Sequence, residues 1–143
     1  GHRFWYRGSN SSDGLSAPVV RGITTHMNTE TVVGLMQRSK IMLNIHHGSD
    51  NYFEWHRIAI LGIGQMALVI SEPSISSPIF HPGIHYVEAK LKDIPEKIKY
   101  YLSNPTGIKE AQKIIERGYE KLTKDCRIID SLQPLISKLE IKI

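Results

Sequence analysis

The stretch KIMLNIHHGSDNYFEWHRIAILGIGQMALVISEP, residues 40–73, decides the fold. The apolar runs at 40–45 and 66–71 lack the alternation of a half-solvated strand, so they predict strands buried on both faces of a parallel sheet. The roughly 20 residues between them suffice for the crossover that parallel neighbours require. We therefore expect a right-handed βαβ unit whose helix starts near Asn51 and is closed by Gly62 and Gly64.

The sequence before this stretch predicts two earlier strands and a helix. Aromatic and β-branched residues at 3–8 and 19–25 predict the strands, and a Ser/Asn/Gly/Pro-rich loop separates them. Asn28 is expected to cap a helix that begins in TETVVGLMQRS, where apolar residues recur at helical spacing.

The sequence after it predicts a short strand and several helices. The strand is expected at 85–89, and the helices are expected from Ile94 onward, with a break near Pro134. The helices should pack on the sheet through four apolar positions: Ile98, Leu102, Ile114 and Leu122. The predicted class is α/β, a doubly wound parallel sheet with C-terminal helices, in a single domain spanning residues 1–143.

Composition narrows the classes of function. The chain has 143 residues, 41% of them hydrophobic, and a net charge of +4 carried by lysines that are spread along the sequence, so we expect no nucleic-acid partner. Its one cysteine, Cys126, excludes an internal disulfide and favours a reducing, cytoplasmic location. No apolar run reaches the ~18 residues of a membrane span. Gly1 and His2 resemble a cloning remnant, so we expect a piece of a longer protein.

Ligands of an open parallel sheet bind beyond the carboxyl ends of its strands. A helix starting near Asn51 would point its positive end to this edge and favour an anion, with Glu54 and Arg57 on one helical face. The candidate ligand-binding residues are those at the carboxyl ends of the strands expected at 3–8, 19–25, 40–45 and 66–71. They are Arg7 and Gly8, Thr25 and His26, His46 with His47 and Gly48, and Ser71 with Glu72.

Competing interpretations exist for these residues. Metal binding is not expected, because His46 and His47 are adjacent on a strand end and project oppositely, and His81 and His85 flank a Pro-Gly turn. Glu54 and Arg57 also suit a plain intrahelical ion pair with no ligand. Nucleophilic triad chemistry has no support: Ser71 lies in no nucleophile-elbow pattern, and Cys126 has no evident base nearby.

The order of these parts resembles a known family. The segment SKIMLNIHHGSDNYFEWHRIAILGIGQMALVISEP, followed by FHPGIHYVEAKLKDIPEKIKYYLSNP and GIKEAQKIIERGYEKL, is similar to the C-terminal half of GT-B glycosyltransferases, and more narrowly to bacterial glycosyltransferase-like proteins. The resemblance covers roughly residues 39–125. It implies a Rossmann-like domain that holds a nucleotide diphosphate sugar, requires no metal, and transfers the sugar to an acceptor held mainly by a separate N-terminal GT-B domain.

The resemblance and the strand-end argument together give the expected site. Two residues are expected to be catalytic, His46 and Glu54. Six are expected to bind the donor: His47, Gly48, Arg57, Ser71, Glu72 and Arg7. Arg57 would supply a fixed positive charge to the diphosphate, Glu54 would orient Arg57 or accept a hydrogen bond from a sugar hydroxyl, and a histidine would stabilise the leaving diphosphate.

The chain also departs from the family pattern. Retaining enzymes of this fold often carry two glutamates eight positions apart, where this chain has Asn51 and Ala59, and the usual basic pair after the first strand appears only as Arg7. The alternative is therefore a non-catalytic nucleotide-binding or protein-interaction domain of the same fold. A receiver-type regulatory domain would need an acidic cluster at the strand ends, which Asp50 and Glu72 alone do not supply.

Overall fold

The computed structural model describes residues 29–46 and 51–138. The chain divides into two compact units, Gly1–Leu35 and Met36–Ile143. Within the first unit only the beginning of helix α1 (Thr29–Gln37) is described, and it confirms the helix predicted there. The strands expected at 3–8 and 19–25 and the Asn28 cap lie outside the described residues.

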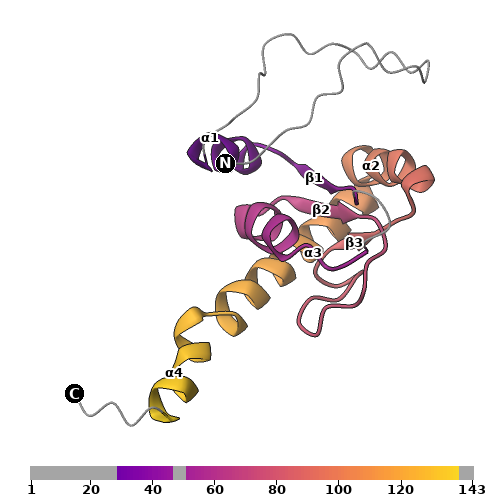
Figure 1. Cartoon of the computed structure of the whole chain (residues 1–143). Helices are drawn as coiled ribbons and strands as arrows, with labels where there is room; N and C mark the ends of the chain where they lie inside the picture. Colours follow the sequence, from indigo (N-terminus) through magenta and orange to yellow (C-terminus); the bar gives the residue numbers. More distant parts are fainter. Residues whose placement is uncertain (1–28, 47–50, 139–143) are drawn as a thin grey trace, which may run out of the picture. The chain divides into compact units, whose positions relative to one another are not determined.

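Three parallel strands form the described sheet, in the order β1 (Ile41–Asn44), β2 (Leu68–Ser71) and β3 (Val87–Glu88) (Figure 1). β1 and β2 pair from Ile41 opposite Leu68 to Asn44 opposite Ser71. A helical segment joins β1 to β2, and helices follow β3. The structure thus confirms the predicted α/β, Rossmann-like parallel sheet with C-terminal helices.

Both faces of β2 are buried, as its unbroken apolar sequence predicts. Val69 packs in one core cluster, with Met42, Ile58, Ile63, Phe80 and Tyr86. Leu68 and Ile70 pack in another, with Val87, Ile94, Ala111 and Ile114. Because side chains alternate along a strand, these clusters lie on opposite faces of the sheet. One is covered by the crossover, and the other by α2 (Ile94–Ser103) and α3 (Pro105–Asp125).

The prediction that residues 40–45 are buried is confirmed only at Met42 and Asn44, because Lys40 is exposed and Ile41 and Ile45 are only partly buried. Leu43 is 45% exposed, although Met42 and Asn44 on either side of it are buried. Leu43 pairs with Ile70 and therefore faces the side covered by α2 and α3. α3 packs against β2. On this face the helices α2 and α3 therefore cover β2 more completely than β1.

The crossover is helical, but it starts later than predicted. It consists of a π-helix, η1 (His56–Gly62), and a 3₁₀ turn, η2 (Ile63–Gln65), so Glu54 precedes the helix rather than lying inside it. The segment before η1 is held by contacts with the loop between β2 and β3. The Asn51 carbonyl accepts a hydrogen bond from the Ile75 amide at 2.6 Å, and the Phe53 ring stacks on the ring of Phe80. These tertiary contacts take the place of the expected first helical turn.

Gly62 is required by the close approach of η1 to the sheet. A Cβ atom on Gly62 would overlap a methyl group of Val69 and lie 2.9 Å from Cε of Met42. Met66, directly after η2, has a left-handed conformation with φ of 57°, so β2 begins at Leu68 and not at Met66 as predicted.

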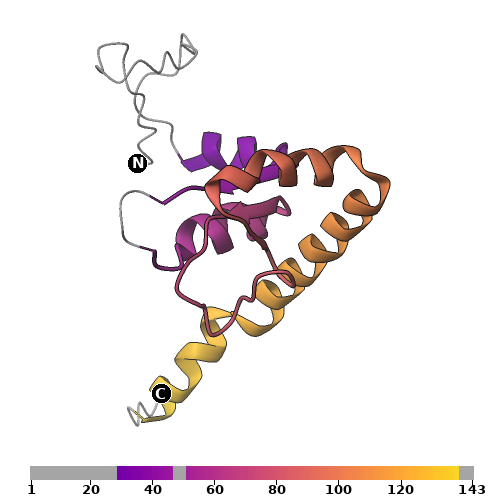
Figure 2. The same cartoon turned by 90° about the vertical axis from the view of Figure 1, so that its right-hand side faces the viewer.

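The helices after Ile94 are confirmed, with two corrections. Figure 2 shows α2 and α3 joined as a helical hairpin, and at their junction the Asn104 side chain accepts hydrogen bonds from the amides of Thr106 (2.9 Å) and Gly107 (3.2 Å). Of the four predicted packing positions, Ile114 is buried and Ile98 and Leu122 are partly buried against the core clusters. Leu102 is 42% exposed, so its prediction as a core residue is wrong.

The predicted break near Pro134 is also wrong. Pro134 lies inside helix α4 (Ile128–Lys138), and the chain breaks earlier, after α3 ends at Asp125. Proline removes only one helical hydrogen bond. The described side chains of α4 are exposed, so water can reach the carbonyl that loses its partner.

Candidate functional site

The candidate site lies where β1 and β2 end. The Glu72 amide donates to the Asn44 carbonyl at 3.1 Å, which extends the ladder one residue beyond the strands. The Glu72 side chain turns back, and its Oε2 accepts a hydrogen bond from the His46 amide at 2.9 Å. Glu72 therefore fixes the backbone at the point where His46 leaves the sheet.

Glu54 lies between two basic side chains. Its Oε1 is 3.3 Å from Nδ1 of His46, and its Oε2 is 3.0 Å from Nε of Arg57. The exposed fraction rises along this chain of groups, from 4% for the His46 side chain to 13% for Glu54 and 51% for Arg57. Arg57 also donates from Nη1 to the Ile45 carbonyl at 3.4 Å. The arrangement leads from a buried imidazole, through a mostly buried carboxylate, to a cation at the surface.

Several buried polar atoms at this edge lack a hydrogen-bond partner among the described residues. They are Oδ1 of Asn44 and both ring nitrogens of His46. The contact between His46 and Glu54 is short enough for an ion pair when the imidazole is protonated, but it is not aligned as a hydrogen bond. Most buried polar groups in native proteins are satisfied, so unpartnered ones commonly indicate a bound water, ion or ligand.

The Ser71 side chain makes buried hydrogen bonds inside the fold and does not face a ligand site at the surface. Its hydroxyl accepts a hydrogen bond from the Asn44 amide at 3.1 Å and donates to the Glu72 carbonyl at 2.9 Å, and the residue is fully buried. Asn44 was not among the predicted site residues. The signal for it was available, because an asparagine ends an otherwise apolar strand.

Four of the eight predicted site residues come together here: His46, Glu54, Arg57 and Glu72. Ser71 lies behind them, and three others lie outside the described residues: Arg7, His47 and Gly48. The expected anion site at the start of the helix has less support. η1 begins after Glu54, and the Ile58 amide already donates to the Glu54 carbonyl at 2.8 Å.

An aromatic cluster, which the sequence analysis missed, holds Glu54 in place. Phe53 and Trp55 flank Glu54, and both pack on Phe80, with ring centroids 6.0 Å and 5.4 Å from it. Phe53 also meets Tyr86 edge-on at 5.9 Å. With aromatic anchors on both sides, the backbone of Glu54 is positioned from the loop that precedes β3. The sequence pattern that could have indicated this cluster is a glutamate with one aromatic residue on each side, Phe53 and Trp55.

A hollow of about 330 Å³ lies at the end of β3 on the same edge of the sheet. The sequence analysis treated the lysines as spread along the chain, yet three of them line this hollow together with two acidic residues. The lining consists of Pro73, Glu88, Ala89, Lys90, Lys92, Asp93 and Lys97. The carboxyl edge of the sheet therefore carries cationic side chains at two places: Arg57, which is paired with Glu54, and this lysine group, which lies beside Glu88 and Asp93.

Among the residues that the structure describes, no three His, Cys, Asp or Glu side chains are placed to hold a metal ion. No helix within the described ranges is both long and apolar enough to cross a membrane.

Comparison with known proteins gives one match. A family model described as "Glycosyl transferase-like" matches residues 7–136. No curated protein and no solved structure matches the chain.

Proposed function

Because the chain belongs to the glycosyl transferase-like family, we propose that it is the donor-binding, C-terminal half of a GT-B glycosyltransferase. The donor is a nucleotide diphosphate sugar, held at the carboxyl edge of the sheet. The reaction transfers its sugar to a sugar or glycan acceptor.

The observation that carries this proposal is the linked arrangement of His46, Glu54 and Arg57. A guanidinium has five N–H donors, and Arg57 directs one to Glu54 and one to the Ile45 carbonyl. The remaining donors are on a half-exposed side chain, which suits a diphosphate at the surface. Since Glu54 is held from both sides, its role is to orient Arg57 and His46.

His46 is the proposed group next to the reacting centre. Its side chain is almost fully buried, and neither ring nitrogen has an aligned partner in the described part of the chain. A preorganised donor stabilises charge best where water is excluded. From a ring N–H, His46 would donate a hydrogen bond to the oxygen that gains charge as the diphosphate leaves, and Glu54 would orient the ring.

Metal-free donor binding belongs to the same proposal. Arg57 and the group Lys90, Lys92 and Lys97 place several positive charges at one edge of the sheet, and positive side chains can neutralise a diphosphate without a metal. The three residues Arg7, His47 and Gly48 stay proposed donor contacts on the basis of their places in the sequence. Ser71 acts through Glu72, to which it is hydrogen-bonded.

A partner domain is the second part of the proposal. Helix α4 exposes Ile129, Leu132, Leu135 and Ile136, which recur at the spacing of one helical stripe. An N-terminal GT-B domain that holds the acceptor would cover such a stripe. A cytoplasmic location fits the free thiol of Cys126.

Titration of the chain with UDP-, GDP- and ADP-hexoses, followed by calorimetry and thermal melting, tests the donor site. One nucleotide sugar should bind saturably and, at 100 times its Kd, add about 2.7 kcal/mol to the free energy of unfolding. Arg57→Ala should weaken that binding at least tenfold, which corresponds to about 1.4 kcal/mol. Arg127→Ala is the matched control, because Arg127 is also an exposed arginine paired with a carboxylate three residues away.

A panel in which no nucleotide or nucleotide sugar binds would contradict the donor site. Unchanged affinity in Arg57→Ala would contradict the role of Arg57. Saturable binding without release of nucleotide diphosphate, even when a partner domain is supplied, would favour the non-catalytic nucleotide-binding alternative.

A further inference from the structure

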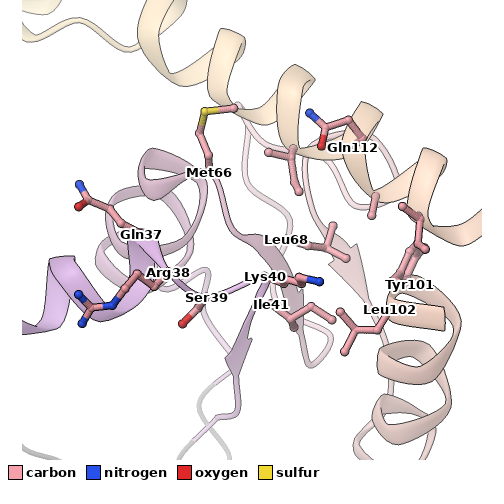
Figure 3. Close-up of a pocket in the computed structure, with 13 residues that line it drawn as sticks. Gln37, Arg38, Ser39, Lys40, Ile41, Met66, Leu68, Tyr101, Leu102 and Gln112 are labelled. Carbon is pink, nitrogen blue, oxygen red and sulfur yellow. The ribbon is translucent and has the colours of Figure 1, made fainter.

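A pocket of about 370 Å³ opens at the opposite edge of the sheet from His46 and Glu54 (Figure 3). Residues at the beginning of β1 and β2 form one side of it, and residues of α2 and α3 form the other. Its volume falls within the range of roughly 300–1,000 Å³ that is usual for small-molecule sites. The pocket is independent of the proposed donor site.

The pocket explains an otherwise unusual exposure of large apolar side chains. Met66 is 46% exposed, Leu102 42% and Ile108 48%, and all three line this one pocket. Ile41, Leu68, Ala111 and Ile115 complete its apolar lining. Scattered apolar residues on a surface need no explanation, but a group that converges on one hollow indicates a binding site.

The charged side chains among the residues that line the pocket have one sign. The lining residues include two cations, Arg38 and Lys40, and no acidic residue. In Figure 3 the Lys40 amine points toward the α2 side of the pocket, whereas the Arg38 guanidinium points away from it. None of the ion pairs found in the described part of the chain involves Lys40. The Lys40 charge is therefore available to a ligand.

A hydrogen-bond donor, Tyr101, lies on the side of the pocket that α2 and α3 form, across from the strands. Partial burial, with a smaller effect from the negative charge of Glu110, raises the pKa of Tyr101, so its phenol stays protonated at neutral pH. Tyr101 lines the pocket next to Leu102. A protonated phenol and an ammonium group both interact favourably with an anion.

From the apolar lining and the single-signed charge, we infer that this pocket binds a small amphiphilic anion. The ligand has an apolar body, which contacts Met66, Leu102 and Ile108, and one acidic head, which pairs with Lys40. Carboxylate and phosphate heads share this chemistry, so the test includes both.

The test uses the whole chain and three eight-carbon probes: octanoate and octyl phosphate below their critical micelle concentrations, and octanol below its solubility limit. Heteronuclear NMR should show saturable shifts at Ile41, Tyr101 and Ala111, with little change at His46 and Glu54. At least one anion should bind five or more times tighter than octanol. Whichever anion binds tighter identifies the head group.

Three variants sharpen the test. Lys40→Gln should weaken anion binding at least fivefold and leave octanol binding unchanged, whereas Lys113→Gln, an exposed lysine of α3 outside the pocket lining, should change neither. Leu102→Trp should fill the pocket and block all three probes; if Lys40→Gln does not fold, this variant and the comparison of wild-type affinities decide. The inference is overturned if no probe shifts the pocket residues, if octanol binds as tightly as the anions, or if Lys40→Gln binds the anions normally.

Discussion

The side-chain amide of Asn44 donates a hydrogen bond to the Ser71 hydroxyl, with Nδ2 and Oγ 3.1 Å apart. Both residues are fully buried, and they form the last register pair of β1 and β2. Their side chains thus connect the two strands directly before the chain leaves the sheet toward His46 and Glu72. A buried polar contact at this place fixes the backbone that carries the candidate site.

Ser71→Ala should therefore destabilise the protein. The substitution leaves the buried Asn44 amide without its acceptor, which costs about 1–3 kcal/mol. Urea unfolding followed by circular dichroism measures the loss. Ser137→Ala on exposed helix α4 is the control and should change the free energy of unfolding by no more than about 0.5 kcal/mol. Equal effects of the two substitutions would show that the Asn44–Ser71 contact has no structural role.

Gly62→Ala should destabilise the protein by overpacking. The added methyl group would overlap a methyl group of Val69 and approach Met42, and insertion of a methyl group into a packed core typically costs about 1–3 kcal/mol. Val69→Ala should partly rescue Gly62→Ala, because it removes the overlapping atoms. The two free-energy changes should therefore be non-additive in a double-mutant cycle. Strict additivity would contradict the close approach.

Sequence reasoning predicted the parallel sheet well because its evidence was local. The uninterrupted apolar run before Ser71 required a strand covered on both faces, and the structure has one. The start of the crossover helix was not predictable in this way. It depends on the contact between Phe53 and Phe80, which are distant in the sequence and meet only in the folded chain. A pattern of helical spacing carries no information about such a competing contact.

The same reasoning explains what was predicted of the site. Strand ends indicated His46 and Glu72, and helical spacing indicated Glu54 and Arg57, so the groups that meet at the edge were found from the sequence. The lysine-lined hollow after β3 was missed, because Lys90, Lys92 and Lys97 are brought together by the turn into α2. From their spacing in the sequence alone, these three lysines would be expected on a solvent-exposed surface without a shared site.

Two apolar positions on the helical hairpin should respond differently to truncation. Ile114→Ala removes a buried side chain and should cost about 2–5 kcal/mol. Leu102→Ala removes a side chain that is 42% exposed and should cost clearly less. Chemical denaturation of both variants in the same buffer makes the comparison. A larger loss for Leu102→Ala would restore the prediction of Leu102 as a core residue.

The turn before β3 should lose stability in mild acid. Nδ1 of His85 accepts a hydrogen bond from the His81 amide at 2.9 Å, so the fold requires this nitrogen to be unprotonated. Burial lowers the pKa of His85, and the positive charges of His81, Lys121 and Arg117 lower it further. The unfolded chain therefore takes up a proton near the ordinary pKa of about 6.5, before the folded protein does. Stability should fall as the pH drops below that value, until the folded-state pKa is passed.

Comparison with His85→Asn isolates this effect from the other histidines. Asparagine keeps an acceptor but does not titrate, so the variant should lose less stability than the wild type between pH 8 and pH 5. Free energies of unfolding at each pH give the two curves. Parallel curves would mean that His85 does not contribute to the acid sensitivity.

The winding of η1 has a consequence for insertions and deletions. At its end, the Ile63 amide is shared between the carbonyls of Ala59 and Ile58, which are the partners of an α-helical and a π-helical turn. A π-helical turn contains one residue more than an α-helical turn between the bonded groups. Loss of one residue from this segment would leave an ordinary α-helix that still spans the distance between Arg57 and the sheet. Related chains are therefore expected to differ by one residue in length here, whereas the distance in sequence from His46 to Glu54 should be constant.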